Sequence, residues 1–366
     1  MARPTDDASM VVPPPVTEGS GLIPPARNFA LQDYLSLSGH PVLHAAGPAP
    51  HSALADGIAA FLHLTEVETY VSGTEAMRAA MTRTIRPNDD VIIDSGAHSA
   101  MFETVLAAGA TPHRCPSGSV EAVERRLKRL SGLRGRGRLF VALSAVSAHG
   151  SVVADLPLLL DLARLHGASL VLDVSHDLGS MGLGGAGLME IQGCLGRIDV
   201  VVGSFAKCFG AKGGFAGFAT SGHHTRTARR PLPAANAAII RAALSIVQSE
   251  QGRTLRRRLH SNTLRLRNHL MADGLPVMGQ PSPLVPLRLP KPTAAARTAL
   301  LHSAGARVTL LQSPIVAAHA PRWRIGLTAN HSAADIDDLA ELIREVSGVF
   351  DRQRRSHAAS PIPTHA

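Results

Sequence analysis

Cysteines and long apolar runs are scarce in this chain of 366 residues. Its three cysteines, Cys115, Cys194 and Cys208, form no close pair, which argues against a disulfide framework or a zinc site, so we expect reduced thiols and no bound metal. No apolar run reaches the roughly 18 residues that span a bilayer, and the first residues lack a basic start followed by an apolar stretch. We therefore expect no membrane span and a cytoplasmic location.

Aromatic residues make up only 3% of the chain, which weighs against nucleic-acid binding despite a net charge of +9. The densest group of arginines alternates with leucines at helical spacing, as in a helix with one buried and one exposed face. This group comprises Arg253, Arg256, Arg257, Arg258, Arg265 and Arg267. We expect no nucleic-acid partner, and a basic rim is better suited to attracting anionic substrates.

Lysine is also rare, because only Lys128, Lys207, Lys212 and Lys291 contribute to the 37 basic residues. A lysine amine can bond covalently to an aldehyde, whereas a guanidinium stays protonated and delocalised. Lys128 lies among arginines on a predicted exposed helix, and Lys291 lies between prolines. Lys207 follows the apolar stretch 199–203, where a strand would hold it at a sheet edge. Lys207 is therefore the favoured reactive amine, and Lys212 is the second candidate.

Apolar strands alternate with amphipathic helices through the first part of the chain. Predicted strands cover 91–94, 139–143, 169–173 and 199–203, and predicted helices cover 120–130 and 156–166. This alternation predicts an α/β fold with a mainly parallel sheet, in which ligands bind beyond the carboxyl ends of the strands.

The character of the sequence changes beyond residue 240. A long helical stretch over about 234–270 precedes predicted strands at 282–287, near 308 and at 322–327. A last helix begins at Ala333, where Ser332 and Asp335 can form a capping box. We predict four parts, namely a mobile arm at 1–28, a large domain at 29–235, a smaller α/β domain at 236–350 and a polar tail at 351–366.

Two polar segments follow neighbouring strands and together supply the groups that pyridoxal 5′-phosphate (PLP) requires. Asp173-Val-Ser-His176 ends one strand, and Ser204-Phe-Ala-Lys207 ends the next. Asp173 can hold the proton on the ring nitrogen, and His176 can reach the phenolic oxygen. Ser204 can bond the phosphate, and Lys207 can bind the aldehyde. An unpaired carboxylate at the end of an apolar strand is costly, which favours a cofactor-binding role over a turn aspartate.

Gly73, Thr74 and His98 complete the predicted cofactor site. Gly73 permits a tight turn, and Thr74 lies where a helix begins, so backbone amides and a hydroxyl can bind phosphate there. His98 follows the strand 91–94 and can stack on the cofactor ring. These residues predict a PLP-dependent enzyme.

Taken in order, these segments resemble motifs of the α-oxoamine synthases, which are fold-type I PLP-dependent transferases. The resemblance runs from about residue 33 to residue 346. Its segments are Asp33–Pro41, Ser72-Gly73, Ala97-His98-Ser99, Val146–Gly150, Asp173–His176, Gly203–Lys207 with Gly213-Gly214, Ser282–Pro286 and Arg324–His331. The resemblance implies that Ser147 approaches the cofactor and that Arg324 binds the amino-acid carboxylate, a role that suits its planar fork.

The chain departs from the family pattern mainly on the side of the acyl substrate. Between Pro41 and Ala53 a short link replaces a long glycine-rich segment, and Met77 stands where the family has an asparagine. His149 replaces an acidic residue, and 312–316 replaces a stretch with a substrate-contacting threonine. The pattern thus supports PLP binding more strongly than any one acyl donor.

The resemblance implies a homodimeric PLP-dependent C-acyltransferase with its active site at the interface. An amino acid would displace Lys207, which would then remove the α-proton, while His98 would cover the ring and His176 would tune it. Attack on an acyl thioester of coenzyme A or a carrier protein, with loss of carbon dioxide, would give an α-amino ketone. Two alternatives stay open: another PLP reaction on this fold, such as transamination or aldol cleavage, and a non-catalytic partner subunit of a synthase.

Overall fold

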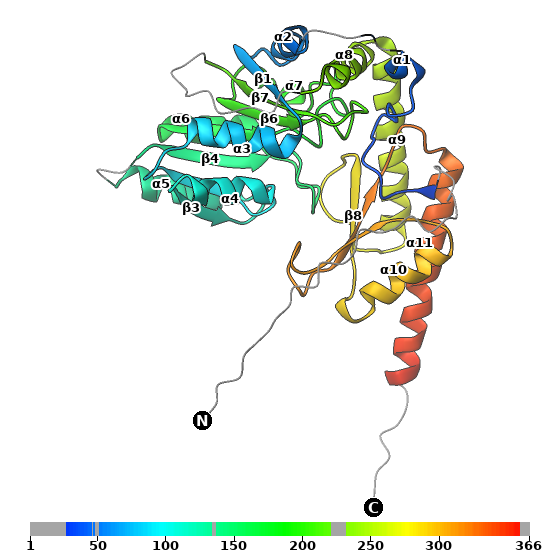
Figure 1. Cartoon of the computed structure of the whole chain (residues 1–366). Coiled ribbons are helices and arrows are strands. Elements are labelled where there is room, and N and C mark those ends of the chain that lie inside the picture. The colour runs from blue at the N-terminus through cyan, green and yellow to red at the C-terminus, as the bar shows by residue number, and fades with distance from the viewer. Residues whose placement is uncertain (1–26, 46, 48–50, 134–136, 221–231, 359–366) are drawn as a thin grey trace, which may run out of the picture.

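The computed structural model describes residues 27–45, 47, 51–133, 137–220 and 232–358 of the chain. Two sheets with helices packed against them make up this part (Figure 1). All but the last two residues of the predicted N-terminal arm lie outside the described residues.

The larger sheet has seven strands in the order β1-β7-β6-β5-β4-β2-β3. Only β7 runs antiparallel to its neighbours, so the predicted mainly parallel α/β fold is confirmed. The strands are β1 (Glu66–Tyr70), β2 (Asp90–Asp94), β3 (Thr111–Cys115), β4 (Leu139–Ser144), β5 (Ala168–Asp173), β6 (Val200–Ser204) and β7 (Gly214–Phe218).

Helices cover both faces of this sheet because its central strands are apolar on both sides. Ile92 faces one core with α5 (Val120–Ser131) and α6 (Leu156–Leu165). Val91 and Ile93 face the other core with α3 (Gly73–Thr84) and α4 (Ser99–Ala107). Helices α1 (Pro41–His44), α2 (His51–Leu62) and α7 (Leu188–Ile191) also belong to this half.

The helical stretch predicted over about 234–270 is two helices, which corrects the prediction of one long helix. Helix α8 (Ala234–Gln248) ends at Ser249, whose backbone is extended, and α9 (Glu250–Ala272) begins directly after it. The Ser249 hydroxyl accepts a hydrogen bond from the Gly252 amide and caps α9. Capping by serine is what allows the second helix to start without a loop.

The smaller sheet is antiparallel and lies beside α9 (Figure 1). Its order is β8 (Leu284–Arg288), β10 (Arg322–Gly326) and β9 (Thr309–Leu311), with α10 (Ala294–Ser303) and α11 (Ala333–Ala358) alongside. The predicted capping box of α11 is present, since Ser332 N donates to Asp335 Oδ2 at 2.8 Å and Asp335 N donates to Ser332 Oγ at 3.1 Å. Helix α11 includes the first eight residues of the segment predicted as a tail.

The segment that follows the predicted arm joins the two sheets. Phe29 O accepts from Gly326 N at 2.7 Å, Tyr34 O accepts from Ala329 N at 2.8 Å, and Tyr34 N donates to Lys207 O at 3.0 Å. The segment therefore ties the smaller sheet to the backbone of the favoured lysine.

The predicted domain boundaries stay a prediction. No helix in the described ranges is long and apolar enough to cross a bilayer.

Candidate active site

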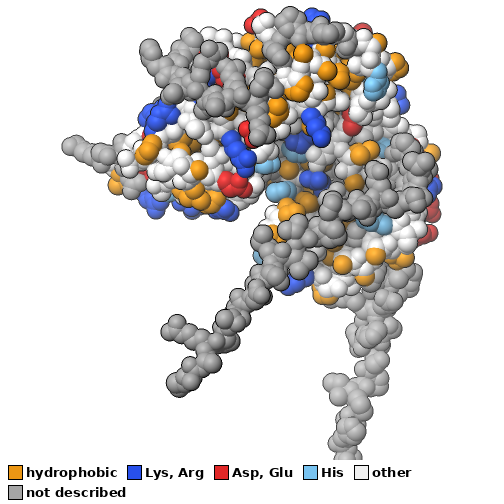
Figure 2. Space-filling model, viewed as in Figure 1, with side chains coloured by type: hydrophobic (Ala, Val, Ile, Leu, Met, Phe, Trp, Pro, Cys, Tyr) orange, Lys and Arg blue, Asp and Glu red, His pale blue; other side chains and the backbone are white. Residues whose placement is uncertain are grey.

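Two cavities meet at the carboxyl ends of β5 and β6. The smaller has a volume of about 210 Å³ and the larger of about 360 Å³, and both are lined by His98, Asp173 and Lys207. Parallel strands end at the same edge of a sheet, so the motifs that follow β5 and β6 come together there. Figure 2 shows Lys, Arg and His side chains gathered in the recess between the two halves of the molecule.

The start of α3 forms the end of the smaller cavity, with Ser72, Gly73 and Thr74 in its lining. Ser72 Oγ accepts from Glu75 N at 3.2 Å, which caps the helix and leaves the first-turn amides of Gly73 and Thr74 without intrahelical acceptors. A Cβ atom on Gly73 would lie 2.7 Å from the Cβ of Ser204. Glycine thus allows the turn to pack against the end of β6, where amides and hydroxyls converge as an anion site.

Lys207 is half-buried where the two cavities meet. Burial lowers the pKa of its amine, and the nearby Asp173 carboxylate opposes this shift in part. Asp173 Oδ1 accepts from Ser175 N at 2.9 Å, and this carboxylate is almost fully buried. Lys212 also lines the smaller cavity but not the larger one, so Lys207 is the lysine that faces both.

The two predicted histidines are held by different contacts. His176 is buried, and its Nδ1 lies 2.7 Å from Tyr34 Oη in a hydrogen bond. Burial, followed by the charges of Lys207 and Arg324, lowers the pKa of His176 well below its ordinary value, so the imidazole is neutral. His98 caps α4, where its Nδ1 accepts from Ala100 N at 3.2 Å. That contact fixes the ring of His98 between the two cavities.

Two residues that the resemblance singled out are placed elsewhere. Ser147 lines neither cavity; its hydroxyl accepts from Val152 N at 3.1 Å and faces a small separate cavity that Asp94 also lines. Arg324 is half-buried in β10, lines neither cavity, and donates to the amide oxygen of Gln32 at 3.0 and 3.2 Å. Its charge nevertheless lowers the pKa of Lys207, and burial lowers the pKa of Arg324 itself.

Three residues of this region were missed by sequence reasoning as parts of the site. Tyr34 bonds to His176 across 142 positions of the chain, a pairing that no spacing could reveal. His149 lines the larger cavity, and burial followed by the charge of Arg324 lowers its pKa. Asp177 is buried next to His176, and burial raises the pKa of its carboxyl to about 7. An acidic residue directly after a predicted cofactor histidine was the available signal.

Comparison with known proteins decides the family. The model of the aminotransferase class I and II family matches residues 20–343. The 8-amino-7-oxononanoate synthase of Halorhodospira halophila is 33% identical over 333 residues, covering 87% of this chain and 81% of that protein. The 2-amino-3-ketobutyrate coenzyme A ligase of Escherichia coli is 27% identical over 358 residues, covering 90% and 89%. The chain belongs to the α-oxoamine synthase family.

Solved structures support the fold of this α-oxoamine synthase. The serine palmitoyltransferase of Sphingomonas wittichii superimposes with a TM-score of 0.80 over 88% of this chain and 87% of that one, at 21% identity. The chain therefore has fold type I, as predicted, and the curated relatives named above show that it is an enzyme.

The cofactor of this α-oxoamine synthase is pyridoxal 5′-phosphate, and the residues present fit it. The smaller cavity offers an anion site at Gly73 and Thr74, a buried carboxylate at Asp173 and a half-buried amine at Lys207. These are the groups that the phosphate, the ring nitrogen and the aldehyde require. In the described part of the chain, no group of three or more His, Cys, Asp or Glu side chains could hold a metal ion.

Proposed function

We propose that this α-oxoamine synthase joins an amino acid to an acyl thioester, with release of carbon dioxide and a free thiol, to give an α-amino ketone. The observation that carries the proposal is the position of Lys207. Its amine faces the cofactor cavity and also the larger cavity, which has room for substrate. A half-buried amine whose pKa is lowered accepts a proton from the substrate more readily, because a larger share of it is unprotonated than of an exposed lysine.

The cofactor, when bound, supplies an electron-withdrawing ring that acidifies the α-carbon of the amino acid. Asp173 would hold the proton of the ring nitrogen, because its carboxylate is buried at the end of β5. Ser204 and Thr74 would bond the phosphate together with the amide of Gly73. Lys207 would take the α-proton.

The histidines would orient the ring. Burial raises the pKa of Tyr34, so its phenol stays neutral and can donate to His176 Nδ1. This leaves the proton of the neutral imidazole on Nε2, where it can be donated to the phenolic oxygen of the cofactor. His98 would cover one face of the ring, since it lines both cavities and its Nδ1 is held by the start of α4.

Arg324 is our proposed partner for the amino-acid carboxylate. Its positive charge is close enough to lower the pKa of both Lys207 and His176. Because its guanidinium is bonded to Gln32, the substrate carboxylate would exchange with the Gln32 amide. A charged acceptor is the stronger partner for a guanidinium, which favours that exchange.

The acyl donor would enter the larger cavity. Arg114 lines it and stacks on Phe102, with its Cζ 3.9 Å from the ring centroid. Such a cation suits an anionic carrier, either coenzyme A or the phosphopantetheine of a carrier protein. We further propose that the enzyme works as a homodimer, as the family resemblance implies.

The test measures thiol and carbon dioxide together. Purified enzyme with PLP is given single amino acids and acyl-coenzyme A thioesters, and both products are quantified. We expect equal amounts of each, and Lys207→Ala should lower turnover by at least about 100-fold. Lys128→Ala is the matched control, because this exposed lysine pairs with Glu124 on the surface and should act like wild type.

A second variant and the alternative reactions give distinct outcomes. Lys212→Ala should keep the visible absorbance band of the lysine-bound cofactor, whereas Lys207→Ala should lose it. Transfer of the amino group to a keto acid without thiol release would identify an aminotransferase and overturn the proposal. Activity only after addition of a second synthase chain would identify a partner subunit.

A further inference from the structure

A glycine-rich loop directly follows His176 and has an unusual backbone. Four of its glycines have positive φ, at 81° for Gly179, 83° for Gly182, 90° for Gly185 and 74° for Gly187. The loop closes on itself, since Gly179 N donates to Gly185 O at 2.7 Å. Glycine adopts these angles without a steric penalty but loses the most conformational freedom on folding. Such a loop needs contacts from outside to hold one shape.

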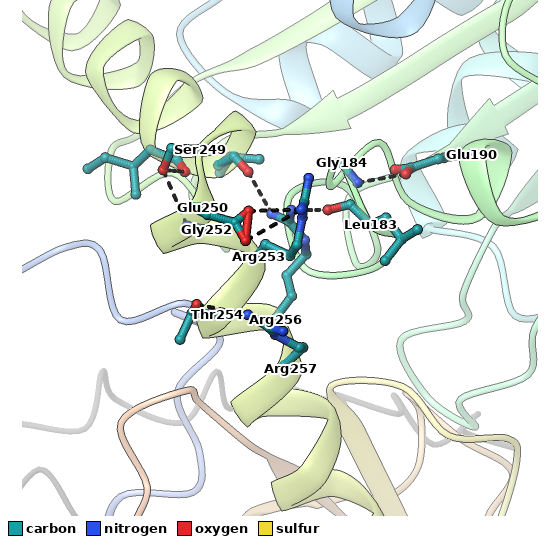
Figure 3. A network of polar contacts seen from close by, with 12 residues as sticks. Leu183, Gly184, Glu190, Ser249, Glu250, Gly252, Arg253, Thr254, Arg256 and Arg257 are labelled. Atoms are coloured by element: carbon teal, nitrogen blue, oxygen red, sulfur yellow. Dashed lines mark hydrogen bonds and ion pairs between the residues drawn. The ribbon is translucent and has the colours of Figure 1, made fainter.

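Arg256 of α9 supplies the main contact (Figure 3). Its Nε donates to Gly182 O at 2.9 Å, its Nη2 donates to Leu183 O, and its Nη1 donates to Val247 O at 2.7 Å. The side chain is 5% exposed, and among the described residues no carboxylate lies within ion-pair distance of it. Burial lowers the pKa of the guanidinium, and the three carbonyl acceptors replace part of the hydration that the buried cation has lost.

Glu190 holds the loop from its other side (Figure 3). Its two carboxylate oxygens accept from Gly184 N at 2.6 Å and from Ala186 N at 2.9 Å. The loop amides therefore bind a carboxylate while the loop carbonyls bind a guanidinium. This division matches the hydrogen-bonding capacity of each group, because guanidinium only donates and carboxylate only accepts.

The loop is bonded back to the residues beside the catalytic cavity. Ser180 Oγ donates to His176 O at 3.1 Å, and Leu188 N donates to Asp177 Oδ2 at 2.7 Å. One hydrogen bond, from Ser180 Oγ, thus connects the loop directly to the backbone of His176. A shift of the loop would move the imidazole relative to Lys207 and the larger cavity.

We propose that Arg256 is a positioning residue that sets the orientation of His176 through this loop. The proposal rests on the assignment of His176 to the cofactor site. It assigns a role to a buried charge that the reaction itself does not use. Because α9 also packs against β8 and α11, Arg256 would also link the smaller sheet to the catalytic cavity.

The test compares substitutions at two arginines of the same helix. Arg256→Met keeps an unbranched side chain about as long as the aliphatic stem of arginine but removes all donors, and Arg256→Lys keeps the charge without the three-way fork. Arg253→Met is the control, since Arg253 is half-exposed and pairs only with Glu250 at 2.8 Å among the described residues. The readouts are the pH titration of the visible absorbance of bound PLP, and kcat and KM for both substrates.

We expect Arg256→Met to shift the titration midpoint and to lower kcat by up to about 100-fold, the effect of a misplacement near 1 Å. Arg256→Lys should be intermediate, and Arg253→Met should match wild type. An Arg256→Met enzyme with an unchanged titration and unchanged kcat would overturn the proposal. The titration needs bound cofactor only, so it answers even if no acyl transfer is found.

A double-mutant cycle separates positioning from general support of the fold. In a His176→Asn background, Arg256→Met should change the titration and kcat far less than in wild type, because the residue it acts through is already altered. Equal effects in both backgrounds would refute positioning through His176. If Arg256→Met does not fold, Glu190→Gln weakens the other side of the loop and takes its place in the same cycle.

Discussion

The carboxyl of Asp177 should make the stability of this enzyme fall as pH rises toward neutrality. It is fully buried, and Oδ2 accepts from Leu188 N at 2.7 Å. No donor in the described part of the chain reaches Oδ1. Burial, followed by the charge of Asp173, raises the pKa of this carboxyl from 3.8 to about 7. We predict that Asp177→Asn stabilises the folded protein at every pH above about 4, and that this stabilisation grows until the pH passes 7.

The direction and the size of this pH-dependent change in stability both come from the raised pKa of Asp177. Between pH 3.8 and 7 the unfolded chain has lost the proton that the folded protein keeps, so unfolding releases a proton and stability declines with rising pH. Above pH 7 the folded protein has lost the proton too, and stability does not decline further because of this carboxyl. A difference of about three pKa units corresponds to about 4 kcal/mol, which is the penalty that asparagine would avoid at pH 8.

The assay is thermal unfolding of wild type and Asp177→Asn with bound cofactor, at equal protein concentration, from pH 5 to pH 9. At pH 8 the variant should melt several degrees higher, and at pH 5, where only about one of the three pKa units has been lost, the difference should be less than half as large. Asp161→Asn is the control, because that carboxylate is exposed. A melting difference for Asp177→Asn that is the same at pH 5 and pH 8 would refute the reasoning.

Two further predictions concern the cofactor site. Gly73→Ala places a Cβ 2.7 Å from the Cβ of Ser204, so the turn must move at a cost of about 1–3 kcal/mol, and PLP affinity measured by fluorescence titration should fall at least about tenfold. Gly39→Ala, with no atom within 4 Å, should bind PLP as wild type does, and equal affinity of all three would contradict the first prediction. Tyr34→Phe leaves His176 Nδ1 without its hydrogen-bond partner, so the free energy of unfolding should drop by about 1–3 kcal/mol. The pH–rate profile should also shift. An unchanged free energy of unfolding together with an unchanged pH–rate profile would show that this hydrogen bond contributes neither to stability nor to catalysis.

How much of the fold could be predicted depended on burial. The central strands β2, β4, β5 and β6 were visible because a parallel sheet covered on both faces needs continuous apolar runs. Strands β1 and β3 lie at the sheet edges and carry polar side chains, and β7 is rich in glycine, so none of them shows a strand pattern. The break between α8 and α9 was missed because neither a proline nor a loop separates them, and α9 begins directly after Ser249.

In the candidate site, too, some side chains could be placed from the sequence and others could not. Asp173, Ser204, Lys207 and Gly73 could be predicted to line one cavity because each ends or follows a strand or begins a helix, where chain geometry dictates the position of a side chain. Ser147 also follows a strand, but its hydroxyl bonds to a backbone amide and faces away from both cavities. Only packing determines which way such a side chain turns.

Local order along the chain was enough to predict the α/β architecture and the chemical class of the cofactor, which are confirmed, and to single out Lys207 as the proposed reactive lysine. These follow from residue types at fixed short spacings, since strands and helix starts hold neighbouring groups in known directions. Tertiary structure alone decided the contact between Tyr34 and His176, the burial that shifts the pKa of Asp177, and the clamp of Arg256 on its loop. Each of these joins residues that are distant in sequence or depends on the exclusion of water. Neither property can be predicted from the local sequence pattern.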